Sequence, residues 1–257
     1  MQLIDLSSPI DPEGWEPEPL SLVTMSAQDG AKHLVSEMRE HFGMDLDPEV
    51  LRDAEFLTND TVSLTTHTGT HIDAPAHYGD ATSYGSAPRT IDQMPVDWFH
   101  RPAVVLDFTG RAPGVITADD VRGELSRVDY QPKELDIVLL HTGADQHAGT
   151  PKYFTEFVGL DQSGLDLLLD FGVRVIGTDA FSLDAPFTHI IETYQRTGDK
   201  SVLWPAHMRG RDREYCQIER LANLAELPRA HGFTLSCFPV KLAGAGAGWA
   251  RAVAIVE

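Results

Sequence analysis

One stretch of this 257-residue sequence decides the fold around it: Thr66-His67-Thr68-Gly69-Thr70-His71-Ile72-Asp73-Ala74-Pro75-Ala76-His77. Three histidines and one aspartate occupy odd positions in it, so their side chains would start on the same face of an extended chain. A flat strand rises ~3.3 Å per residue and would hold His67 and His71 about 13 Å apart. Ligands of one metal ion lie within a few ångströms of each other, so the chain must bend if these side chains share an ion.

The composition of the stretch predicts where it bends. Its repeated threonines, Gly69 and Pro75 oppose a helix, which would otherwise bring positions four residues apart together. Gly69 supplies a flexible point between His67 and His71. We therefore expect a strand that runs into a tight turn.

The ligand types indicate the metal. Two imidazoles and a carboxylate, with no thiolate nearby, suit Zn²⁺ or Mn²⁺, and Fe²⁺ or Co²⁺ are also compatible. A single histidine would most simply be a surface or core residue. Three histidines and an aspartate within eleven residues, around a Gly-Thr pair, favour the metal site instead.

Charge and composition narrow the partners. The 20 basic and 39 acidic residues give a formal charge of -19, which repels nucleic acid and anionic membranes. We expect the partner to be a small molecule or another protein chain. No apolar run approaches the ~20 residues that span a bilayer, and the segment 1–5 lacks the features of a signal peptide. The sequence predicts a cytoplasmic protein.

The order of the predicted elements indicates an α/β fold with one domain over residues 1–257. Apolar, β-branched runs predict strands at 103–108, 136–140, 173–177, 233–238 and 252–256. Helices are predicted at 118–125, with Thr117 as N-cap, and at 165–171, which Gly172 ends.

Two segments are expected to be insertions, at 14–53 and 185–206. The first contains an amphipathic helical pattern within 24–53, and the second lies in a polar stretch that reaches residue 212. Both are predicted to act as lids; a surface helix and a long solvated loop are the alternative. The glycine-rich stretch 244–248 lacks the Lys-Ser/Thr of a phosphate loop, so we expect a turn between two strands.

The stretch from His67 to His77 resembles the HxGTHxDxPxH signature of the metal-dependent cyclase superfamily, which includes bacterial kynurenine formamidase and isatin hydrolase. Three other segments extend the resemblance over most of the chain: 5–10 resembles the family's first strand, 177–184 its GxDxxSxD segment, and 205–207 with 218–219 its downstream ligands. The step of twelve residues from His207 to Glu219 also agrees with the family's spacing.

The resemblance implies a metal centre. His67, His71 and Asp73 would bind one ion, and Asp73 and Glu219 would bridge to a second ion held by His207. One or two Zn or Mn ions per chain are therefore expected. Asp179, Ser182 and Asp184 are predicted to hold turns or to support the ligands by hydrogen bonds.

The resemblance also implies roles outside the ligand set. His77 takes the place of the family's catalytic acid/base. Trp15 sits where the formamidases have a substrate-stacking tryptophan, but its neighbours differ from theirs, so packing is an equal alternative. The implied fold is a swivelling β/β/α domain with a central mixed, barrel-like β-sheet flanked by helices, assembled as a homodimer or homotetramer.

The function implied is hydrolysis of an amide, cyclic amide or lactone of a small molecule by water that the metal activates. The same site could instead catalyse cyclisation or dehydration in a biosynthetic pathway. A binding protein with a degenerate site is disfavoured, because all five expected ligands and the proton carrier are present.

Overall fold

The computed structural model describes residues 1–257, which form two compact units. One comprises Met1–Glu16 together with Thr66–Glu257, and the other is Pro17–Thr65. The hydrophobic core lies in the larger unit, which also contains every residue expected at the metal centre.

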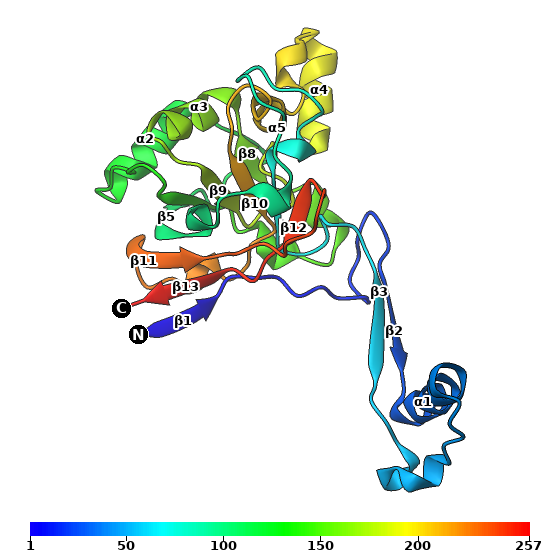
Figure 1. The fold of residues 1–257 in the computed structure, drawn as a ribbon. Coiled ribbons are helices and arrows are strands. Elements are labelled where there is room, and N and C mark those ends of the chain that lie inside the picture. Colours follow the sequence, from blue (N-terminus) through cyan, green and yellow to red (C-terminus); the bar gives the residue numbers. More distant parts are fainter. The chain divides into compact units, whose positions relative to one another are not determined.

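The larger unit is built on a nine-stranded sheet with the order β1-β13-β11-β5-β7-β9-β10-β4-β12 (Figure 1). Neighbours from β5 to β10 are parallel and the others are antiparallel. The strands are β1 (Gln2–Asp5), β4 (His71–Asp73), β5 (His100–Asp107), β7 (Ile137–His141), β9 (Val175–Thr178), β10 (Cys216–Glu219), β11 (His231–Ser236), β12 (Ala247–Trp249) and β13 (Val253–Val256). All five strands predicted from apolar runs are present. The curled mixed sheet confirms the predicted fold class.

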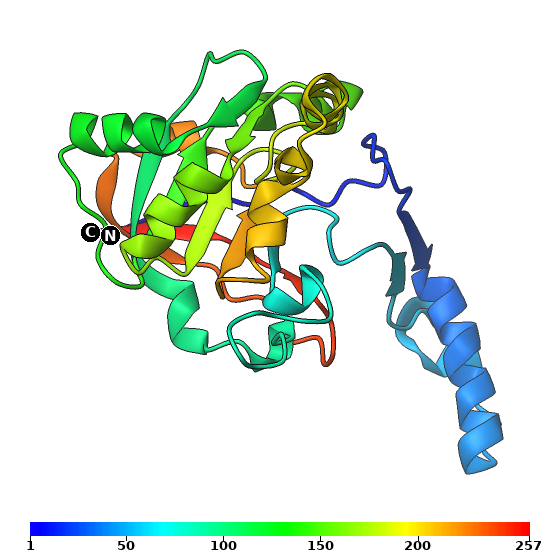
Figure 2. The same cartoon turned by 90° about the horizontal axis from the view of Figure 1, so that it is seen from above.

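The central strands are buried on both faces, which explains their continuous apolar sequences. In β7, Ile137 and Leu139 pack into one core cluster, whereas Val138 and Leu140 pack into a second. The first cluster lies inside the curl of the sheet, where it meets residues of β1, β11 and β13. Figure 2 shows the two termini side by side, because β1 pairs with β13.

Helices and a small sheet cover the second cluster. Val121 and Leu125 of α2 (Ala118–Arg127) pack there with leucines of α3 (Gln162–Asp170), and both helices lie on the same face of the sheet (Figures 1 and 2). Thr117 caps α2 as predicted. The third helix begins earlier than predicted, because the Asp161 side chain accepts a hydrogen bond from the Gly164 amide. Strands β6 (Gly114–Ile116) and β8 (Val158–Leu160) form a two-stranded parallel sheet.

Two expectations about irregular segments need correction. The polar stretch after residue 185 is not a long loop, since it forms α4 (Phe187–Thr197) and α5 (Pro205–Arg209). In the glycine-rich stretch, Ala247 and Gly248 belong to β12 and pair with β4. Only the part before them makes the turn that was expected, where Gly244 has φ +76°.

The smaller unit contains a hairpin and one helix. Strands β2 (Ser21–Met25) and β3 (Asn59–Ser63) pair antiparallel, and α1 (Ala27–Phe42) runs from the cap Ser26 to Gly43, whose φ is +63°. Only Gly30 and Ala31 are buried in this unit. Eight of its large apolar side chains are exposed: Leu22, Val23, Phe42, Met44, Val50, Phe56, Leu57 and Val62. The predicted lid role and the predicted homo-oligomer both stay predictions.

The packing around Gly159 of β8 generates a test of the fold. A Cβ at Gly159 would lie 2.1 Å from the carbonyl carbon of Asp184, so the backbone there would have to move. We expect Gly159→Ala to lower the free energy of unfolding by about 1–3 kcal/mol or more. Gly123→Ala in α2 is the control: a Cβ there meets nothing within 4 Å, and a gain of about 0.5–1 kcal/mol is expected. Urea unfolding measures both, and a stable Gly159→Ala would contradict the packing described.

Candidate metal centre

The stretch from Thr66 to His77 bends twice around a short strand. A turn precedes β4, and a 3-10 helix, Pro75–His77, follows it. The expected bend at Gly69 is present, with φ +68°, and a Cβ there would lie 2.7 Å from the Ile10 side chain. The order of the elements differs from the prediction, because the turn leads into the strand rather than out of it. Its placement lets the Gly69 carbonyl lie 2.8 Å from Nδ1 of His71.

Strand β10 brings the second half of the site to the first. It pairs antiparallel with β4, so that Glu219 is opposite His71 and Gln217 is opposite Asp73. Directly opposed residues of an antiparallel pair project from the same face of the sheet. This register therefore gathers four polar side chains on one buried patch.

His207 approaches from α5, and Asp184 fixes it there. The Asp184 carboxylate accepts hydrogen bonds from the backbone amides of Ala206 and His207, at 2.6 and 3.1 Å. It also lies 2.5 Å from Nδ1 of the His207 ring. Asp184 thus makes hydrogen bonds of the kind predicted for it, and they orient the His207 ring.

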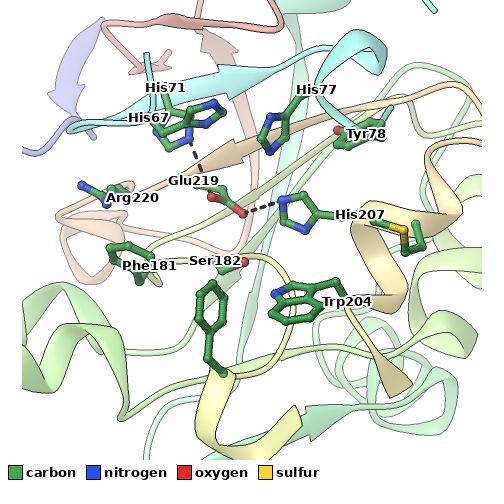
Figure 3. A pocket seen from close by; sticks show the side chains of 12 residues that line it. His67, His71, His77, Tyr78, Phe181, Ser182, Trp204, His207, Glu219 and Arg220 are labelled. Atoms are coloured by element: carbon green, nitrogen blue, oxygen red, sulfur yellow. Dashed lines mark ion pairs between the residues drawn. The ribbon is translucent and has the colours of Figure 1, made fainter. Parts of the chain in front are cut away.

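All six residues expected at the centre converge, and Figure 3 shows five of them, His67, His71, His77, His207 and Glu219, around the cavity. Asp73 is the common member: its carboxylate lies 3.1 Å from His67 Nδ1, 3.5 Å from His71 Nε2, 3.8 Å from His77 Nε2 and 3.9 Å from His207 Nε2. Glu219 lies 3.6 Å from His71 Nε2 and 3.9 Å from His207 Nε2.

The sets of candidate ligand atoms that lie close together differ from the set that the family resemblance implied. One set, His71, Asp73 and Glu219, has its ligand atoms within 4.8 Å of one another, and so has a second set of His67, Asp73 and His77. His77 was expected to be a proton carrier, yet it lies close enough to Asp73 to be a ligand as well. The individual roles of these residues stay predictions.

Two buried atoms indicate whether these residues could bind a cation. Nε2 of His71 and Oδ1 of Asp73 are buried, 3.5 Å apart, and have no hydrogen-bond partner. Since Nδ1 of His71 faces the Gly69 carbonyl, it carries the proton and Nε2 presents a lone pair. Unsatisfied buried polar atoms are rare in folded proteins. A divalent metal ion would satisfy both, so the residues present fit such an ion.

Burial and mutual charge shift the pKa values of the cluster. Burial lowers the pKa of His71 and of His77 to about 4 each, so both imidazoles are neutral at pH 7. Burial, together with repulsion from Asp73, raises the pKa of Glu219 to about 7. Burial would also raise the pKa of Asp73, but the surrounding histidines hold it well below its usual range. Burial opposes protonation of His207, yet Asp184 and the other carboxylates raise its pKa to about 9.

Gln217 is a site residue that the motif analysis missed. It is fully buried, and its amide nitrogen lies 3.0 Å from Oδ2 of Asp73 and 2.7 Å from Nε2 of His207. A signal existed, because residues two apart in a strand share a face, so Gln217 had to lie beside Glu219 once β10 was recognised as a strand.

A cavity of about 380 Å³ opens above the cluster (Figure 3). Apart from the candidate ligands, its walls include Tyr78, Phe181, Phe187, Trp204, Met208 and Arg220. Trp15 is not one of the lining residues. Its ring contacts Phe154 at 6.3 Å, and Phe154 in turn contacts Phe181 and Phe187. A direct contact of Trp15 with substrate stays a prediction.

Fold and site define an α/β protein with a candidate histidine–carboxylate metal centre on neighbouring strands, and known proteins are similar to this chain in sequence and fold. The Cyclase family, described as "Putative cyclase", matches residues 4–185. A kynurenine formamidase of Salinibacter ruber is 31% identical over 197 residues, which cover 75% of this chain and 77% of that protein. The chain belongs to the Cyclase family.

Solved structures share the fold. An isatin hydrolase bound to the product analogue thioisatinate superposes with a TM-score of 0.75 at 21% identity, covering 100% of this chain and 92% of the other. Isatin hydrolase A from Ralstonia solanacearum gives 0.74 at 21% identity, with the same coverage. No helix of this chain is long and apolar enough to cross a membrane.

The Asp184–His207 contact generates a pH prediction for protein treated with a chelator. Asp184→Asn removes the charge that raises the pKa of His207, so this pKa should fall from about 9 toward the ordinary value near 6.5. Because the folded pKa lies above the unfolded one, the stabilisation is present below about pH 6.5 and is lost as the pH rises through about 9.

NMR titration of the His207 ring measures the pKa, and urea unfolding at several pH values measures the stability. The control is Asp161→Asn at the N-cap of α3, which should leave the His207 titration unchanged. An unaltered His207 pKa in Asp184→Asn would contradict the role given to Asp184.

Proposed function

We propose that this chain is a metal-dependent hydrolase that cleaves an amide, cyclic amide or lactone bond of a small molecule. The observation that carries the proposal is the pair of buried atoms without hydrogen bonds, His71 Nε2 and Asp73 Oδ1, surrounded by further ligand types. Buried polar atoms without hydrogen bonds destabilise a protein, and a protein that only binds organic ligands would have no need of them.

His67, His71, Asp73 and Glu219 would hold the ion. Their imidazole and carboxylate donors suit Zn²⁺ or Mn²⁺. When bound, such an ion lowers the pKa of water and polarises a carbonyl oxygen. The protein keeps the His71 imidazole in the required form: burial leaves the ring neutral at pH 7, and its Nδ1–H donates to the Gly69 carbonyl.

His77 would move the proton in this proposal. Its side chain is about one-third exposed at the cavity, whereas those of His71 and Asp73 are fully buried. Because burial lowers the pKa of His77 to about 4, the ring is neutral at pH 7 and can accept a proton at Nε2. It would then deliver that proton to the leaving nitrogen or oxygen.

The cavity favours a planar, apolar substrate group. Phe181, Phe187 and Trp204 present aromatic rings and Met208 a flexible thioether, which together suit an aromatic ring. The names of the relatives agree with an amide bond, since one is a formamidase and others hydrolyse isatin, a cyclic aromatic amide. An aromatic formamide or lactam is therefore the first substrate class to assay.

Loss of a ligand should remove metal and activity together. We expect His71→Ala to lower metal affinity on the order of 100-fold or more, because loss of an outer hydrogen-bond partner alone costs about 10–100-fold. Elemental analysis and turnover of an aromatic amide would be measured on the same samples. His33→Ala is the control, since His33 is an exposed histidine of α1 in the smaller unit. Full activity in metal-free protein would exclude the proposal.

Isotope labelling separates hydrolysis from ring closure or dehydration. With an amide substrate in ¹⁸O-water, a hydrolase should place solvent oxygen in the new carboxylate, because water supplies the attacking oxygen. Mass spectrometry of the product measures the label. Product incubated alone in ¹⁸O-water corrects for exchange, and enzymatic conversion without label would favour cyclisation.

A further inference from the structure

We propose that this chain binds a single metal ion, because the side-chain amide of Gln217 takes the place of a second cation between Asp73, His207 and Glu219. The inference rests on the proposed function for the first ion, but not on the reaction. It assigns Gln217 a role that the motif did not indicate, and it removes His207 from the ligand set.

The amide nitrogen of Gln217 is in contact with all three groups that were expected to hold the second ion. It lies 3.0 Å from Asp73 Oδ2, 2.7 Å from His207 Nε2 and 3.3 Å from Glu219 Oε1. The two carboxylate contacts form whatever the protonation state of His207, and the third forms when that ring is neutral. Metal ions hold such ligands at about 2.0–2.2 Å, so an ion here would collide with the amide.

The amide cannot easily turn away. Gln217 is fully buried, and its side-chain oxygen lies 3.1 Å from the hydroxyl of Tyr215. The single proton of this hydroxyl can be donated to that oxygen or to the Ala206 carbonyl at 2.8 Å, and the Tyr215 ring stacks on Tyr78 at 5.2 Å. Moving the amide would leave buried donors and acceptors without partners, which costs about 1–3 kcal/mol for each group.

The two carboxylate oxygens of Asp73 differ in their hydrogen bonding, as expected if only one of them faces a metal ion. On one side, Oδ1 and His71 Nε2 have no hydrogen-bond partner. On the other side every candidate ligand atom already has one: Oδ2 contacts Gln217, and Oε1 of Glu219 accepts from the Leu183 amide at 2.8 Å. The His207 ring is held at Nδ1 by Asp184, and the Gln217 amide lies 2.7 Å from its Nε2, where a metal ion would have to enter. Only the first side is left for a cation.

The experiment measures metal ions per chain in the full-length protein loaded with excess Mn²⁺ and desalted, by elemental analysis and by Mn²⁺ EPR. We expect one ion and the signal of an isolated Mn²⁺ in the wild type. Gln217→Ala should accept a second ion, with the signal of a spin-coupled pair, because it removes the amide that lies against Asp73 Oδ2 and His207 Nε2. Gln162→Ala, an exposed glutamine of α3, should stay at one.

His207→Ala provides a second, independent arm should Gln217→Ala fail to fold. Because His207 is not a ligand in this proposal, the variant should keep one ion and its isolated signal. Two ions in the wild type, loss of the single ion in His207→Ala, or one ion in folded Gln217→Ala would each overturn the inference. A wild type that binds no metal would instead exclude the proposed function itself, so the two failures are distinguishable.

Discussion

The antiparallel pairing of β4 with β10 is the constraint on which the rest of the site depends. It places Glu219 opposite His71 and Gln217 opposite Asp73, and so sets two carboxylates side by side in a buried patch. A shift of register by one residue would turn all four side chains to the opposite face. Ile72 and Ile218 alternate with them and are fully buried in the core behind, which fixes the register.

Burying two carboxylates is unfavourable unless other groups compensate for the loss of water. The protein compensates with imidazoles around Asp73 and with the Leu183 amide and Gln217 at Glu219. The compensation is incomplete at the buried Asp73 Oδ1, which has no hydrogen bond although His67 Nδ1 lies 3.1 Å away. The uncompensated negative charge therefore lies at one position, Asp73 Oδ1. Because core residues pack on both faces of the sheet, the strands cannot shift to relieve it.

The sequence predicted those features whose signals are local. The apolar runs of β5 and β7 and the cap at Thr117 depend on a few neighbouring residues, and each was found. The hairpin of β2 and β3 was missed, because both strands are largely exposed and Asn59–Ser63 shows no apolar alternation. That His207 and Glu219 converge on Asp73 could be predicted only from the family resemblance. The register between strands that are distant in sequence has no local signal.

The segment that follows β9 shows why the site needs support beyond its ligands. The Leu183 amide donates to Glu219 while the Leu183 carbonyl accepts from the Leu160 amide at 2.7 Å, so one residue joins β10 to β8. Asp184, the next residue, orients His207, and its backbone lies against Gly159, where no side chain would fit. The positions of Glu219 and His207 are therefore set by the same two residues. Because both contacts come from one rigid segment, a change in β8 would displace Glu219 and His207 together, although β8 supplies no ligand of its own.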